Sequence, residues 1–117
     1  MIQRIESGPR MSQAVVFQKT VYLAGQVSHS DAPPDVYIQT VQVLASIDRL
    51  LAAAGTDKTQ LLSATIWLTD MDSFADMNRA WDAWVAPGCT PARATVQSAR
   101  LAAPQYKVEI GVIAAQP

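Results

Sequence analysis

Arg93 is the residue whose type and surroundings first suggest chemistry. It follows Pro91 in the run 90–96, and both of its neighbours are alanines, which cannot screen its charge. A guanidinium presented on a rigid strand can hold a planar carboxylate through two parallel hydrogen bonds. Arg93 is therefore a candidate carboxylate clamp. The alternative is a structural ion pair with an acidic side chain of the same chain, because such pairs are common.

Glu109 is the one acidic residue in the apolar run 108–113. A lone carboxylate in such a run needs a partner, since leaving it unpaired away from water is costly. Arg93 is a candidate for that partner. If the two strands form a simple hairpin, however, the register leaves the two side chains several residues apart. The spacing alone therefore leaves open whether they meet.

Three other residues could bind or react. By its spacing, Asn78 belongs to the apolar stripe of a predicted helix, where an unpaired amide would cost about 1–3 kcal/mol. We expect it to tie down a neighbouring loop, with contact to a ligand as the alternative. Cys89 and His29 are the only cysteine and histidine. Neither lies in an activating context, and together they cannot form a usual zinc site.

The composition limits the classes of function. A chain of 117 residues is enough for one domain, which we place at 1–117. Half of the residues are hydrophobic and 16% are charged, so part of the apolar surface is expected to face a second copy of the chain. The net charge of −1 and the scattered basic residues disfavour nucleic acid binding. No apolar run reaches the ~20 residues of a membrane span, and we expect a soluble, cytoplasmic protein.

Periodicity predicts the elements that must position these residues. We expect one helix at 34–54, ended by Gly55, and a second at 73–86, capped by Asp72. In the first helix, Gln39 falls on the polar face. Its predicted apolar stripe is Tyr37, Val41, Leu44, Ile47 and Leu51. The predicted strands are 2–6, 14–17, 20–24, 62–69, 92–98 and 106–114.

The order of these elements indicates an α+β sandwich with one mostly antiparallel or mixed sheet. Two helices would cover one face of the sheet, which leaves the other face free for oligomerisation. Within the strand at 62–69, alternation puts Leu62, Ala64, Ile66 and Leu68 on one side. Trp67 and the threonines then lie on the other side, which is a candidate subunit interface.

Several short motifs in this order resemble the reactive intermediate deaminase family, also called the Rid or YjgF family. Some members of that family were named as endoribonucleases or translation inhibitors. The match covers nearly the whole chain, and the motifs are specific only when taken together. They are residues 12–15 (SQAV), 25–26 (GQ), 39–40 (QT), 74–78 (FADMN), 91–93 (PAR) and 108–110 (VEI).

The resemblance implies a chorismate-mutase-like fold and a homotrimer with pockets in the clefts between subunits. Active members hydrolyse imines and enamines, such as 2-aminoacrylate, to 2-keto acids and ammonia without a cofactor or metal. By position, Arg93 matches the arginine that grips the substrate carboxylate. Glu109 matches the carboxylate that positions or deprotonates the attacking water. Gly25 lines the same cleft, Thr95 stands where active members often have cysteine, and Asn78 matches the family asparagine.

Two positions depart from the pattern of the active members. Met11 stands where many have a tyrosine, and Ala24 stands where many have a serine. The pocket thereby loses two hydroxyl groups and gains apolar walls. We expect an imino acid that is bulkier or more apolar than 2-aminoacrylate.

Other functions remain open at this point. The second hypothesis is a non-catalytic trimer that binds or senses a small carboxylate, with Arg93 as its anchor. Retention of Glu109 favours the enzyme, and loss of the two hydroxyls favours the binder. Ribonuclease activity is disfavoured because the chain has a single histidine and no basic stripe. A trimer without a ligand is the remaining alternative.

Overall fold

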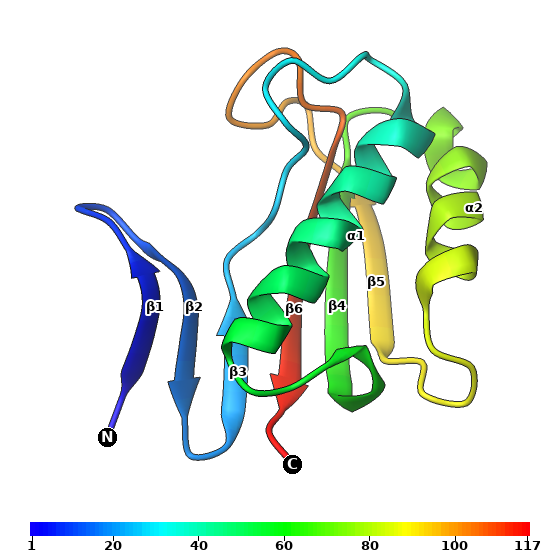
Figure 1. Cartoon of the computed structure of the whole chain (residues 1–117). Coiled ribbons are helices and arrows are strands. Elements are labelled where there is room, and N and C mark those ends of the chain that lie inside the picture. Colours follow the sequence, from blue (N-terminus) through cyan, green and yellow to red (C-terminus); the bar gives the residue numbers. More distant parts are fainter.

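A computed structural model describes all residues, 1–117. Six strands form one sheet in the order β1-β2-β3-β6-β4-β5, and both helices cover the same face of it (Figure 1). The helices are α1 (Val36–Ala53) and α2 (Phe74–Trp84). The strands are β1 (Gln3–Ser7), β2 (Ser12–Phe17), β3 (Thr20–Leu23), β4 (Leu61–Leu68), β5 (Ala92–Gln97) and β6 (Val108–Ala115). The predicted α+β class, with a mixed sheet and two helices on one face, is confirmed.

The connection between β5 and β6 is not a hairpin. β5 pairs with β4 in parallel at one edge of the sheet, whereas β6 inserts between β3 and β4 and runs antiparallel to both. Residues 98–107 form the loop that carries the chain from the edge to the centre. Arg93 and Glu109 therefore lie on strands that are not neighbours.

Local sequence explains most of the element ends. The β2–β3 turn places Gln18 and Lys19 at positive φ, as expected for a two-residue hairpin. Asp35 caps α1 by accepting a hydrogen bond from the N–H of Ile38. After α1, Gly55 has a φ of 77°, the left-handed conformation that ends many helices. Neither helix is long and apolar enough to cross a membrane.

The buried face of α1 differs from the prediction. Val41 is 46% exposed, and Gln39 is fully buried rather than on a polar face. The amide of Gln39 donates hydrogen bonds to the carbonyls of Pro33 and Gln105 and accepts one from the N–H of Lys107. Because it is fully bonded, burial of this amide is tolerated. It joins the loop before α1 to the loop before β6.

Two further boundaries differ from the prediction. A register shift between Leu61 and Ser63 leaves Leu62 51% exposed and puts Leu61 into the core. Asp72 does not cap α2, because a 3-10 turn at Met71–Ser73 precedes the helix and Asp70 caps that turn instead. In both cases an extra residue or turn changes which side chain occupies the predicted position.

The uncovered face of the sheet is partly apolar. Cross-strand partners share a face, so Tyr22 and Ile113 lie side by side there, as do Trp67 and Val96. Tyr22 is 45% exposed and Val96 is 46% exposed. The core lies on the other face, between the sheet and the helices.

Replacing Gln39 tests the link between the two loops. Gln39→Leu leaves two carbonyls and one N–H without their partner, so we expect the free energy of unfolding to fall by about 2–4 kcal/mol. Gln42→Leu is the matched control, because Gln42 lies on the same helix and accepts one hydrogen bond, from the N–H of His29. Chemical denaturation measures both variants. Equal losses would contradict the assigned role of Gln39.

Candidate functional site

Arg93 lies at the start of the edge strand β5 and faces the helices. It pairs with Ala64 of β4, a core residue, so both side chains point to the helix-covered face. The guanidinium carbon is 5.2 Å from the centre of the Trp81 ring and 5.8 Å from that of Phe74. Nη1 lies 4.0 Å from the sulfur of Met77. Arg93 thus rests on the aromatic and thioether side chains of α2.

No acidic side chain neutralises Arg93. The ion pairs of the chain are Arg49 with Glu6 and Arg79 with Asp76. The structural ion pair considered for Arg93 is therefore not formed. Cation–π contacts hold the guanidinium in place, and only Nη1 donates a hydrogen bond within the chain, to the sulfur of Met77, which leaves the other donors available. Its full positive charge can attract a carboxylate that comes from outside the chain.

Two other predicted site residues lie near Arg93 in the fold. Thr95 is two residues further along the same strand and faces the same side, and its buried hydroxyl has no hydrogen-bond partner. Asn78 is half-buried on α2, one turn after Phe74. Its amide makes no hydrogen bond within the chain, so the expectation that it ties down a neighbouring loop is wrong.

Glu109 lies in the centre of the sheet and faces the uncovered side. It pairs with Trp67 of β4, whose side chain points away from the core. The backbone of Gly25 packs against the carboxyl group, since a Cβ at Gly25 would overlap Oε2 and lie 2.8 Å from Cδ. Any side chain at position 25 would therefore require the Glu109 carboxyl group to move. Burial by these neighbours raises the pKa of Glu109.

Arg93 and Glu109 do not meet within one chain. They occupy opposite faces of the sheet and are two strands apart, about 10 Å across the ladder. The ion pair between Arg93 and Glu109 of the same chain, which their spacing left open, is therefore not formed. Glu109 has no ion-pair partner either, which agrees with its raised pKa.

The remaining predicted residues divide between the two regions. Ala24 is half-buried and precedes Gly25, whose backbone lies against the Glu109 carboxyl group. Met11 lies in the turn between β1 and β2 and is 49% exposed. That turn is at the opposite edge of the sheet from β5, about 20 Å away across the ladder. One chain therefore holds two candidate half-sites, which are Arg93 with Thr95 and Glu109 with Gly25 and Ala24.

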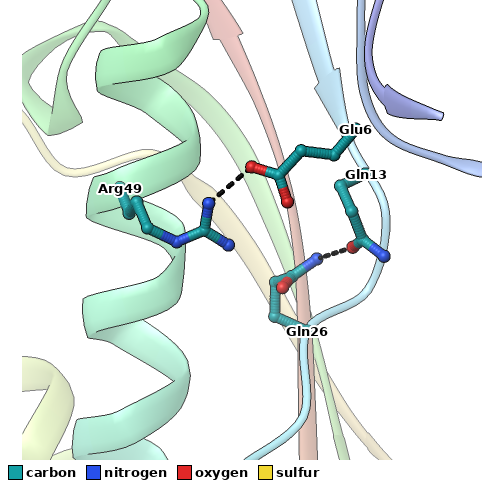
Figure 2. A network of polar contacts seen from close by, with 4 residues as sticks. All are labelled: Glu6, Gln13, Gln26 and Arg49. Carbon is teal, nitrogen blue, oxygen red and sulfur yellow. Dashed lines mark hydrogen bonds and ion pairs between the residues drawn. The ribbon is translucent and has the colours of Figure 1, made fainter.

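Sequence reasoning missed two features of these half-sites. The side chain of Gln26 bonds to that of Gln13 (Figure 2). Gln26 directly follows Gly25, and Gln13 lies at the start of β2. Phe74 and Trp81, which lie within the predicted helix 73–86, also support Arg93, and helical spacing did not predict this contact. Alternation along β5 puts Arg93 and Thr95 on one face, but only the pairing with β4 shows that the helices cover that face.

The other reactive residues and hollows lie elsewhere. His29 is exposed, Cys89 is half-buried, and no contact joins them. No group of three or more His, Cys, Asp or Glu side chains could hold a metal ion. A surface hollow of about 490 Å³ is lined by residues 100–104, and one of about 220 Å³ lies between α1 and α2. Neither includes Arg93 or Glu109, so neither half-site is an enclosed pocket in one chain.

Comparison with known proteins identifies the class. The family model described as Endoribonuclease L-PSP matches residues 1–116. The chain therefore belongs to this family, which is also the Rid or YjgF family. A crystal structure of a YjgF family member from Neisseria meningitidis has a TM-score of 0.95 and 44% identity, and the match covers 100% of this chain and 96% of that one.

Two kinds of named relatives match this chain. A RutC family protein of Haemophilus ducreyi is 48% identical over 98% of this chain and 97% of its own length. The 2-iminobutanoate/2-iminopropanoate deaminase of Mus musculus is 36% identical over 90% of this chain and 80% of its own length. The chain is thus similar both to RutC family proteins and, at lower identity, to imine deaminases.

The desolvated carboxyl of Glu109 leads to a prediction about stability. Its pKa is raised above the ordinary value of 4.5, so the folded chain binds this proton more tightly than the unfolded chain does. The contribution of Glu109 to stability therefore falls as pH rises from the ordinary value through the raised one. We expect Glu109→Gln to be more stable than the unchanged protein at pH 7, with the advantage lost below about pH 4.

Thermal unfolding at several pH values and one protein concentration measures this difference. Asp82→Asn is the control, because Asp82 is exposed on α2 and forms no ion pair. A Glu109→Gln variant that is less stable than the unchanged protein at pH 7 would contradict the prediction.

Proposed function

We propose that the protein hydrolyses reactive imines and enamines of amino acids to 2-keto acids and ammonia. The observation that carries this proposal is the unneutralised guanidinium of Arg93, held without an acidic partner at the edge of the sheet. A substrate that bears a carboxylate supplies the missing partner. The similarity to proteins named 2-iminobutanoate/2-iminopropanoate deaminase supports the same chemistry.

The reaction needs few groups. Arg93 binds the carboxylate and fixes the imine carbon in place. Glu109, in its ionised form, accepts a proton from water as the water oxygen attacks that carbon. Attack on the protonated imine gives a neutral carbinolamine. Glu109 then returns its proton to the amine nitrogen, the C–N bond breaks and ammonia leaves, and the hydroxyl group releases its proton to solvent as the carbonyl of the keto acid forms. A carboxylate whose pKa is raised by burial is a stronger base for the first step.

We propose that the working site lies between two copies of the chain in a homotrimer. Arg93 and Glu109 face opposite sides of the sheet, so one chain cannot direct both at a single small molecule. The partly apolar uncovered face that carries Glu109 offers the contact surface, with Tyr22 and Val96 exposed on it. In a cyclic assembly, the edge strand of one copy can approach the uncovered face of the next.

The side-chain preference is proposed from Met11 and Ala24. Both replace residues that carry hydroxyl groups in many active family members, and Met11 is exposed and available to a neighbouring copy. We therefore propose imino acids with apolar side chains, such as those derived from leucine and methionine. Rates on these imines that equal or fall below the rate on the alanine-derived imine would contradict this preference.

A non-catalytic carboxylate-binding or regulatory trimer is the second candidate. The free guanidinium of Arg93 supports it equally, because binding requires only the anchor. The raised pKa of Glu109 favours the enzyme, since a binder gains nothing from a desolvated carboxyl group. Turnover separates the two candidates, whereas binding of a keto acid does not.

Arg93→Ala tests the anchor. We expect kcat/KM for imine hydrolysis to fall by about 100-fold or more, because the charge-assisted contact to the carboxylate is lost. An amino-acid oxidase generates the imines, and their disappearance is followed continuously. Arg79→Ala is the matched control, since Arg79 also rests on an aromatic ring. Its guanidinium carbon lies 4.0 Å from the centre of the Tyr37 ring. Full activity of Arg93→Ala would refute the assigned site.

Mixing two inactive variants tests the site between subunits. Arg93→Ala and Glu109→Gln chains are unfolded together, mixed in equal amounts and refolded. If each site takes Arg93 from one copy and Glu109 from the next, random cyclic assembly restores about a quarter of the sites. Refolding each variant alone is the control. No recovery of activity in the mixture, with trimers formed, would place both residues in the same chain's site.

A further inference from the structure

Gln26 connects the segment that lies against Glu109 to β2 through its side-chain amide. Its Nε2 donates one hydrogen bond to Oε1 of Gln13, at 2.9 Å, and one to the carbonyl of Ala24, at 3.0 Å. The residue is only 9% exposed. Figure 2 shows the two glutamines reaching toward each other from separate segments of the chain. The segment Ala24–Gln26 is therefore held through the Gln26 side chain as well as along its backbone.

Backbone hydrogen bonds hold the same segment on both sides of Gly25. The N–H of Ala24 donates to the carbonyl of Gln13, and Gln26 exchanges two backbone hydrogen bonds with Ile110. Ile110 directly follows Glu109. Gly25 thus spans from β2 to β6, and its backbone lies against the Glu109 carboxyl group. Any displacement of this segment changes the wall against which Glu109 rests.

We propose that Gln26, together with Gln13, is a positioning residue for Glu109. The amide pair holds Ala24 and Gly25 against the carboxyl group, which limits the orientations of that group and keeps water from its inner side. Gln26 itself does not contact the substrate. This inference rests on the proposed function, because it assigns the pair a role in placing the catalytic carboxylate.

A second polar contact in the same region provides a comparison. Arg49 of α1 forms an ion pair with Glu6 of β1, and both side chains are about half exposed (Figure 2). This contact joins a helix to the edge strand and touches neither Gly25 nor Glu109. Exposed ion pairs contribute little to stability. Breaking it changes polar contacts near Gln26 without releasing the segment at Gly25.

The test uses methionine, which has nearly the length of glutamine but no hydrogen-bonding amide. Gln26→Met removes both hydrogen bonds of Nε2, and Gln13→Met removes one. We expect kcat to fall about tenfold in Gln26→Met and less in Gln13→Met, because small displacements of a catalytic group are costly. We expect KM and the Kd for 2-ketobutyrate to stay within about twofold, since Arg93 is in the other half-site. Arg49→Gln is the control, and we expect its kcat to equal that of the unchanged protein.

Amide hydrogen exchange of Ala24 and Gln26, whose N–H groups donate to the carbonyls of Gln13 and Ile110, gives a readout that does not require turnover. We expect faster exchange in Gln26→Met and unchanged exchange in Arg49→Gln. Unchanged kcat and unchanged exchange in Gln26→Met, with an active parent protein, would overturn the inference and leave the proposed function intact. A rise in the Kd for 2-ketobutyrate by the same factor as the fall in kcat would also overturn it. An inactive parent protein would refute the proposed function, and exchange alone would then decide whether Gln26 holds the segment.

Discussion

The pleat of the sheet is the constraint on which the candidate site depends. Successive side chains of a strand point to opposite faces, and β4 carries this alternation to both of its neighbours. Arg93 pairs with Ala64, whose side chain faces the core, and Glu109 pairs with Trp67, whose side chain faces the uncovered side. The two charged groups are therefore separated by the sheet itself, and no side-chain rotation brings them together in one chain. A site that uses both must draw them from two copies.

Each candidate half-site keeps a charged group without an oppositely charged partner. Aromatic rings and a thioether support Arg93 where an acid could have paired with it. Gly25 and the neighbouring strands desolvate Glu109 without offering it a cation. Such arrangements cost folding stability and are typical of functional sites. The well-packed core beneath the sheet and the fully bonded amide of Gln39 offset that cost elsewhere in the fold.

Local patterns in the sequence predicted the order of the elements. They misplaced individual side chains where a strand irregularity or a distant contact decides which side chains are buried. The hairpin at Gln18 and the helix end at Gly55 follow from backbone preferences that act locally. Leu62 was misplaced because a strand irregularity moves it off the core face, which alternation alone cannot show. Gln39 was misplaced because its burial depends on carbonyls supplied by Pro33 and Gln105, and the latter is 66 residues away.

The sequence by itself determined the fold class and singled out both charged residues of the candidate site. Periodicity is a local property, and Arg93 and Glu109 each stand out against apolar neighbours. Only the tertiary structure decided how they relate. The insertion of β6 between β3 and β4 put Glu109 in the centre of the sheet, and parallel pairing put Arg93 at its edge on the other face. Strand order and register arise from long-range packing, which spacing along the chain does not encode.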